Sequence, residues 1–203
     1  LPHLGTKRGL FILDFTNAKW QETPLVFPDH EYACLGAAVW RDAAYIPVGA
    51  GIYGYQTSSN PAVITPMGPD RDYGLPAAYI GNIIKILNEH NDMYALLDAT
   101  SETPRNLFTG GYVLDGVFYD NLGFSLLLKW NGQGWSITYA GGSDGAAIKT
   151  GVVCSADSKY RLWFAIDRKV YYIDLTANIR NPLELPTYRH ALSCSHEWPW
   201  FDA

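Results

Sequence analysis

Residues 148–175 read IKTGVVCSADSKYRLWFAIDRKVYYIDL, and this stretch decides the fold class. It contains three apolar runs rich in β-branched and aromatic residues, and the polar segment Ala156–Lys159 joins the first two. Short runs of this composition, bounded by turn-forming residues, are typical of β-strands. We therefore predict three consecutive antiparallel strands at 148–153, 160–165 and 170–175.

The same pattern recurs along the chain as a unit of two hairpins, which makes four antiparallel strands. Complete units begin near Leu35, Gly81 and Ile148, so their spacings are about 46 and about 67 residues. The longer spacing is explained by Thr100–Gly123, a glycine- and asparagine-rich insertion between the second and third strands. Without this insertion the period is near the roughly 45 residues of a four-stranded β-propeller blade. The sequence therefore predicts an all-β fold made of propeller blades.

The repeat divides the chain into five segments. They are a partial blade of outer strands at 1–32, blades at 33–69, 76–142 (with the inserted loop 100–123) and 146–187, and the start of a next blade or an exit strand at 188–203. Arg189–Cys194 is the candidate opening strand of the last segment. Because an open propeller exposes sheet edges and apolar faces, we expect a larger propeller, completed by the remainder of a longer chain or by other protein subunits.

The predicted hairpins have recognisable turn residues, at Thr16–Asn17, Ser58–Asn60, Asn131–Gly132 and Thr176–Asn178.

Segment 76–90 also allows a short helix, because isoleucine and leucine recur at helical spacing between Ile80 and Leu87. Gly81 and the β-branched isoleucines weaken that helix. The segment also occupies the position of the first strand in the other units. We therefore favour a strand.

Charge and hydropathy patterning argue against two classes of partner. The formal net charge of −5 and the pI of about 5.4 leave no basic footprint for nucleic acid. Residues 43–69 carry no charge, but glycines and prolines break the stretch and Gln56–Asn60 is polar. Such a stretch fails as a membrane-spanning helix. We expect neither a nucleic-acid partner nor a membrane span.

The three cysteines, Cys34, Cys154 and Cys194, are far apart and have no CxxC spacing. An odd number argues against a full disulfide framework, although one pair remains open. Cys194 and His196 are two residues apart and so share a strand face, which fits two metal ligands or a nucleophile–base pair. Because no second cluster supplies further ligands, a structural role at a sheet edge is favoured. We predict no metal and no cofactor.

Residues 49–54 read GAGIYG and match the GxGxxG dinucleotide-binding pattern. That chemistry needs a helix directly after the glycines, whose N-terminus holds the pyrophosphate. The following residues, Tyr55–Pro61, do not favour a helix. We therefore interpret these glycines as a turn between two strands.

Acidic residues provide the main enzymatic alternative. Asp70, Asp72 and Asp115, with Asp120 nearby, could supply the paired carboxylates of a glycoside hydrolase. These aspartates fall in loops rich in glycine, proline and asparagine, where Asp is common for turn chemistry. The Ser-x-Asp-x-Gly-x-x-Trp box of sialidase-type blades is missing, and Ser143–Gly145 only partly matches it. We predict a protein that is not an enzyme and keep a carbohydrate-active enzyme as the alternative.

Tryptophans provide a second alternative, a lectin. Trp130 and Trp135 flank a polar turn, and Trp198 and Trp200 lie close together near Ala203. Exposed aromatic rings on loops can stack on sugars, whereas core and inter-blade packing explains most such residues in β proteins. Glycans therefore stay open as ligands.

Three stretches carry a family resemblance. LLLKWNGQGW at 126–135, GAAIKTGVV at 145–153, and YRLWFA with VYYIDL between 160 and 175 resemble propeller segments of tailed-phage tail and virion proteins. The resemblance extends from Gly36 onward, and His196–Asp202 is similar to the strand that leaves such a propeller toward a neighbouring domain. It implies a rigid structural or receptor-facing module at a virion or extracellular surface, whose partners are other protein subunits. It transfers no catalytic residues.

Overall fold

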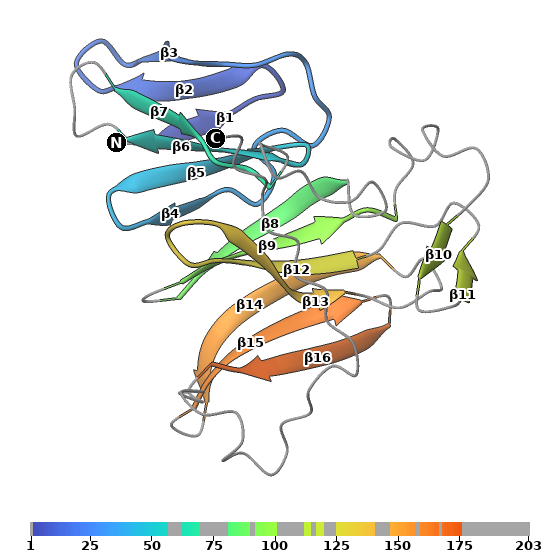
Figure 1. The fold of residues 1–203 in the computed structure, drawn as a ribbon. Coiled ribbons are helices and arrows are strands. Elements are labelled where there is room, and N and C mark those ends of the chain that lie inside the picture. The colour runs from blue at the N-terminus through green and yellow to red at the C-terminus, as the bar shows by residue number, and fades with distance from the viewer. Residues whose placement is uncertain are drawn as a thin grey trace, which may run out of the picture.

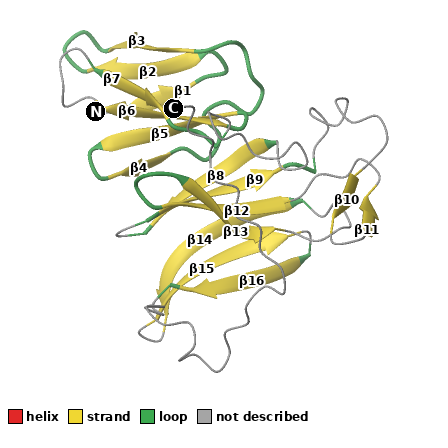
Figure 2. Cartoon of the chain, in the orientation of Figure 1, coloured by secondary structure: helices red, strands yellow, loops and turns green. Residues whose placement is uncertain are grey.

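The computed structural model describes residues 2–56, 62–69, 81–89, 92–100, 112–114, 117–119, 125–140, 147–156, 159–166 and 168–175. Within these ranges all regular structure is β: there are sixteen strands and no helix (Figure 2). Every strand pairing is antiparallel. The prediction of an all-β fold is therefore confirmed.

Apart from the separate two-stranded hairpin of β10 (Tyr112–Leu114) and β11 (Val117–Tyr119), the strands form four sheets of three or four strands, which we number I to IV in chain order. Sheet I contains β1 (His3–Gly5), β2 (Gly9–Asp14) and β3 (Lys19–Val26). Sheet II contains β4 (Ala38–Trp40), β5 (Ala43–Val48), β6 (Gly51–Gln56) and β7 (Val63–Pro66). Sheet III contains β8 (Asn82–Asn88), β9 (Met93–Asp98), β12 (Ser125–Trp130) and β13 (Trp135–Ala140). Sheet IV contains β14 (Ile148–Ala156), β15 (Lys159–Ile166) and β16 (Lys169–Asp174).

Within each sheet the strands lie side by side in the order in which the chain reaches them. Between β9 and β12, which are paired neighbours in sheet III, the chain includes the separate hairpin of β10 and β11. This is where the sequence predicts the insertion Thr100–Gly123. Figure 1 shows the four sheets stacked one on another from sheet I (blue) to sheet IV (orange).

Local turn chemistry explains two of the predicted hairpins. In the β2–β3 turn, Oδ1 of Asp14 accepts a hydrogen bond of 2.8 Å from the amide of Thr16. In the β12–β13 turn, Oδ1 of Asn131 accepts bonds from two following amides, and Gly132 has a φ of +98°, which glycine adopts readily. These two predicted turns are confirmed, and those at Ser58–Asn60 and Thr176–Asn178 lie outside the described residues.

Strand β8 resolves the alternative of a helix at 76–90 in favour of a strand. Its register against β9 shifts between Ile83 and Lys85. The bulge lets Ile83 and Ile86 pack together toward sheet II, while Ile84 and Leu87 pack toward sheet IV. This shift explains why the isoleucine spacing resembles a helical pattern.

Three apolar layers hold the stack together. The layer between sheets I and II contains buried Leu10, Leu25, Phe27, Ile46 and Tyr55. The layer between sheets II and III includes Trp40, Ile52, Ile83, Met93, Leu126 and Leu128. The layer between sheets III and IV includes Tyr94, Leu96, Leu127, Leu162, Phe164 and Ile166. Sheet III is thus buried on both faces, which is why its strands β9 and β12 are nearly continuous apolar runs.

The glycine-rich stretch at 49–54 is a tight turn leading into a strand, as predicted. Gly49 has a φ of +62°, and β6 begins at Gly51. The chain continues as an extended strand to Gln56, so no helix follows the glycines. The dinucleotide-binding pattern therefore lacks its phosphate-binding element. No helix in the described ranges is long and apolar enough to cross a membrane.

Candidate functional site

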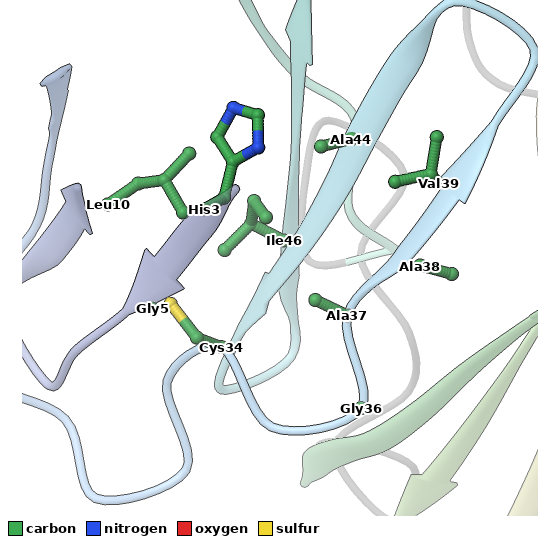
Figure 3. Close-up of a pocket in the computed structure, with 10 residues that line it drawn as sticks. All are labelled: His3, Gly5, Leu10, Cys34, Gly36, Ala37, Ala38, Val39, Ala44 and Ile46. Carbon is green, nitrogen blue, oxygen red and sulfur yellow. The ribbon is translucent and has the colours of Figure 1, made fainter. Parts of the chain in front are cut away.

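A cavity of about 360 Å³ lies between β1 and β2 of sheet I and β4 and β5 of sheet II (Figure 3). Most of its wall is formed by the small residues Gly5, Gly36, Ala37, Ala38 and Ala44. Leu10 and Ile46 add buried apolar side chains, and His3, Cys34 and Val39 complete the lining. Walls of this kind admit the close approach of a backbone or an apolar side chain.

Cys34 is held at the cavity by its backbone. Its φ is +62°, an uncommon conformation for a residue other than glycine, and its amide donates a 2.8 Å hydrogen bond to the carbonyl of Pro47. The thiol donates to the carbonyl of Thr6 at 3.5 Å. Burial raises the pKa of the thiol, and the Thr6 bond opposes this shift only in part. The thiol is therefore not activated as a nucleophile.

His3 is the second polar group of the cavity, and it does not act as a base toward Cys34. Its imidazole is exposed and contacts the ring of Tyr55 edge-on, with centroids 6.2 Å apart. The thiol is bonded to the Thr6 carbonyl instead. In the part of the chain that the structure describes, no three metal-binding side chains come together. The cavity has the chemistry of a binding site for an apolar or extended-chain group.

Trp130 and Trp135 are brought together across the β12–β13 turn. They are cross-strand partners, and their ring centroids are 5.4 Å apart. Both side chains are half-buried and pack on the layer between sheets II and III. The indole N–H of Trp135 donates a 2.6 Å hydrogen bond to the carbonyl of Met67. This pair therefore has a packing role, which connects the end of β7 to sheet III.

The remaining predicted site residues lie outside the described residues. They are Asp70, Asp72, Asp115, Trp198 and Trp200, together with Asp120, Cys194 and His196. The described Cys34 and Cys154 are free thiols. A site built on these aspartates or on the last tryptophans stays a prediction.

Sheet IV has an apolar outward face, opposite the layer that it shares with sheet III. Val152, Trp163 and Tyr172 are cross-strand neighbours on this face, and Val170 lies beside them. Val152 is 51% exposed, Tyr172 54% and Val170 67%. The Arg161 guanidinium lies 4.9 Å from the ring centroid of Tyr172. The face is thus an aliphatic and aromatic surface that also carries a cation, Arg161.

Sheet I has a similar outward face at the other end of the stack. Leu4 pairs with Phe11 and Leu13 pairs with Trp20, so these side chains point away from sheet II. Leu4 is 45% exposed, Trp20 46% and Val26 59%. Contiguous exposed apolar surfaces of this kind usually mark an interaction site.

Neither of these two outward faces is among the sites predicted from the sequence, although the sequence carries a signal for both. A strand with one face in water alternates apolar and polar residues. Every residue in the stretches 162–165, 170–173 and 10–13 is apolar, so both faces of each strand are apolar. This pattern predicts strands covered on both faces, whereas the structure covers each end sheet on one face.

The stack of antiparallel sheets defines the class of protein, an all-β chain built of repeated sheets. Comparison of the chain with protein-family models, curated proteins and solved structures finds no match.

Proposed function

We propose that the chain is a non-catalytic structural module, a run of β-propeller blades that assembles with further β-sheets through the outward faces of sheets I and IV. The observation that carries this proposal is the exposure of apolar side chains at both ends of the stack, such as Trp20 and Val170. Each interior layer is formed by two such faces packed together. A further sheet of the same kind, from a longer chain or another subunit, would bury each end face in the same way.

The resemblance of residues 126–175 to propeller segments of phage tail and virion proteins supports a setting in such a particle. That resemblance implies a rigid structural or receptor-facing module, and a stack of sheets joined by buried apolar layers suits a rigid module. A lectin role for Trp130 and Trp135 is less favoured, because both rings pack on the core and the Trp135 indole N–H is already bonded.

Analytical ultracentrifugation over a range of protein concentrations tests the assembly role. We expect the isolated chain to associate as its concentration rises, because association covers the end faces. Val170→Lys places a charge on the sheet IV face and should shift the chain to monomer. Val63→Lys is the matched control, a 46% exposed valine on β7 that lies on neither end face. A wild-type chain that stays monomeric throughout, or equal effects of both variants, would refute the proposal.

A further inference from the structure

The turn between β12 and β13 contains Asn131–Gly132, and Asn131 is the one asparagine of the chain that glycine follows. Both residues are exposed to solvent, and the cross-strand pair of Trp130 and Trp135 closes the turn. In such a dipeptide the backbone nitrogen of the glycine can attack the side-chain carbonyl carbon of the asparagine. Glycine permits the attack because it has no Cβ to obstruct the approach. A nucleophile and an electrophile therefore stand next to each other at the surface.

Hydrogen bonds within the turn activate the Asn131 side chain for this reaction. Its Oδ1 accepts a bond of 2.9 Å from the amide of Gln133 and one of 3.0 Å from the amide of Gly134. Both bonds draw the side chain over the peptide units that follow it, toward the Gly132 nitrogen. The attack places a negative charge on Oδ1, and donors already aimed at such an oxygen stabilise the transition state. The turn therefore supplies two oxyanion donors.

The attacking nitrogen of Gly132 is accessible. Gly132 has a φ of +98°, and no atom beyond its two chain neighbours lies within 4 Å of the point where a Cβ would stand. No hydrogen bond from the Gly132 amide is found among the described residues. Its proton can therefore pass to hydroxide without the loss of a bond within the protein.

We propose that Asn131 is a site of spontaneous deamidation, which converts it in the folded protein to aspartate and isoaspartate through a cyclic succinimide. The Gly132 nitrogen forms a bond to Cγ of Asn131 and gives its proton to hydroxide. The bond from Cγ to Nδ2 then breaks, and Nδ2 leaves as ammonia with a proton from water. Water opens the ring at either carbonyl carbon, so both products form and no further reactant is needed. This modification does not depend on the outward faces of sheets I and IV.

The two products differ in their effect on the hairpin. Aspartate keeps an oxygen acceptor for the two amides and adds a negative charge. Isoaspartate places the former Cβ in the main chain, so the turn becomes longer. Because turn geometry sets the register of a hairpin, isoaspartate should disturb the pairing of Trp130 with Trp135. It should also weaken the bond from the Trp135 indole to the Met67 carbonyl, so the isoaspartate form should unfold at a lower urea concentration.

Incubation of the purified chain at mildly alkaline pH measures the reaction. Peptide-resolved mass spectrometry follows Asn131, with Asn17 and Asn88 as internal references, because the residues after them, Ala18 and Glu89, carry a Cβ. Asn131 should convert about tenfold or more faster than either reference, since it combines an unobstructed nitrogen with two oxyanion donors. An Asn131 rate no higher than that of Asn17 would overturn the proposal.

Two variants of the same turn separate the attack of the nitrogen from other effects of substitution. Gly132→Ala adds a Cβ beside the attacking nitrogen and should lower the Asn131 rate to that of Asn17. Gly134→Ala is the matched control, because it keeps the backbone donor to Oδ1 and its new Cβ meets no atom within 4 Å. It should leave the Asn131 rate unchanged. Equal rates in the two variants would contradict the proposal.

The wild-type chain, compared when folded and when unfolded in urea, provides a test without any substitution. Only the folded turn holds the amides of Gln133 and Gly134 at Oδ1, so the folded chain should convert Asn131 at least as fast as the unfolded chain. If the folded chain converts Asn131 several times more slowly, the turn protects the side chain and the proposal is wrong.

Discussion

Sheet III is buried on both faces, and alanine substitution of two adjacent leucines tests this directly. Leu126 and Leu127 are neighbours on β12, and both are 0% exposed. Leu126 packs in the layer toward sheet II, and Leu127 packs in the layer toward sheet IV. A sheet with one face in water would bury only one of two adjacent side chains. In this stack, Leu126→Ala and Leu127→Ala should therefore both be strongly destabilising.

The magnitude follows from burial and from the position of the strand. Removing a buried leucine side chain typically costs about 2–5 kcal/mol, and the cost rises when the surroundings cannot collapse into the cavity. Strand β12 is paired on both sides, with β9 and β13, so collapse is restricted. We expect each substitution to lower the free energy of unfolding by about 3 kcal/mol. Leu35→Ala, at a leucine that is 51% exposed, should cost at most about 0.5 kcal/mol.

Urea unfolding at a fixed protein concentration, followed by tryptophan fluorescence, provides the assay. The slope of the unfolding free energy against urea concentration should be the same in all three variants, so that midpoints can be compared. If Leu126→Ala or Leu127→Ala lowers the free energy of unfolding as little as Leu35→Ala does, the corresponding face of sheet III is not covered. The stacking of sheets described above is then refuted.

Three further outcomes are expected. Gly36→Ala should destabilise the chain by about 2 kcal/mol, because φ is +66° and the added Cβ would meet the β8 backbone, whereas Gly134→Ala, with no atom within 4 Å of the new Cβ, should be near neutral in the same urea assay. Burial raises the pKa of the Cys34 thiol, so less thiolate forms near neutral pH. Alkylation of Cys34 should therefore be slower than that of a small free thiol and should increase only at higher pH. A pH profile that matches the small thiol would contradict this. Trp135→Phe keeps a ring but removes the donor to the Met67 carbonyl, so it should lower the free energy of unfolding in urea by about 1 kcal/mol. Trp130→Phe is the control, because no such indole bond is found for Trp130 among the described residues, and it should cost less. A larger loss in Trp130→Phe would show that packing dominates at both sites.

The sequence predicts the strands well because strand signals are local. Alternating or continuous apolar runs bounded by turn residues give β2, β3, β12 and β13, with their turns at Thr16–Asn17 and Asn131–Gly132. The run at 126–128 also indicates a strand covered on both faces. These features depend on residues close together in the chain, so they can be read without the structure.

The cavity could not be predicted, because it depends on contacts between distant segments. Strand β1 has no β-branched residue and becomes a strand only by pairing with β2. Cys34 reaches the cavity through a positive φ that no sequence pattern indicates. The β8 bulge is similarly invisible, since the spacing of Ile83 and Ile86 fits a helix as well as a bulged strand. Residues of sheets I and II meet only after the sheets have stacked.

The stack also predicts a gradient of stability along the chain. Sheet III is covered on two faces, whereas sheets I and IV are covered on one, so β9 and β12 have more buried apolar contacts than β2 or β16. Segments with fewer buried contacts open more often, and their amides exchange hydrogen faster. In native-state hydrogen exchange, we expect the amides of Ala95–Leu97 and Leu126–Leu128 to be the slowest and those of Val170–Tyr172 to be much faster. If a partner sheet covers the outward face of sheet IV, exchange in β16 should slow toward that of sheet III. Uniform exchange across all four sheets would show that the end sheets are already covered.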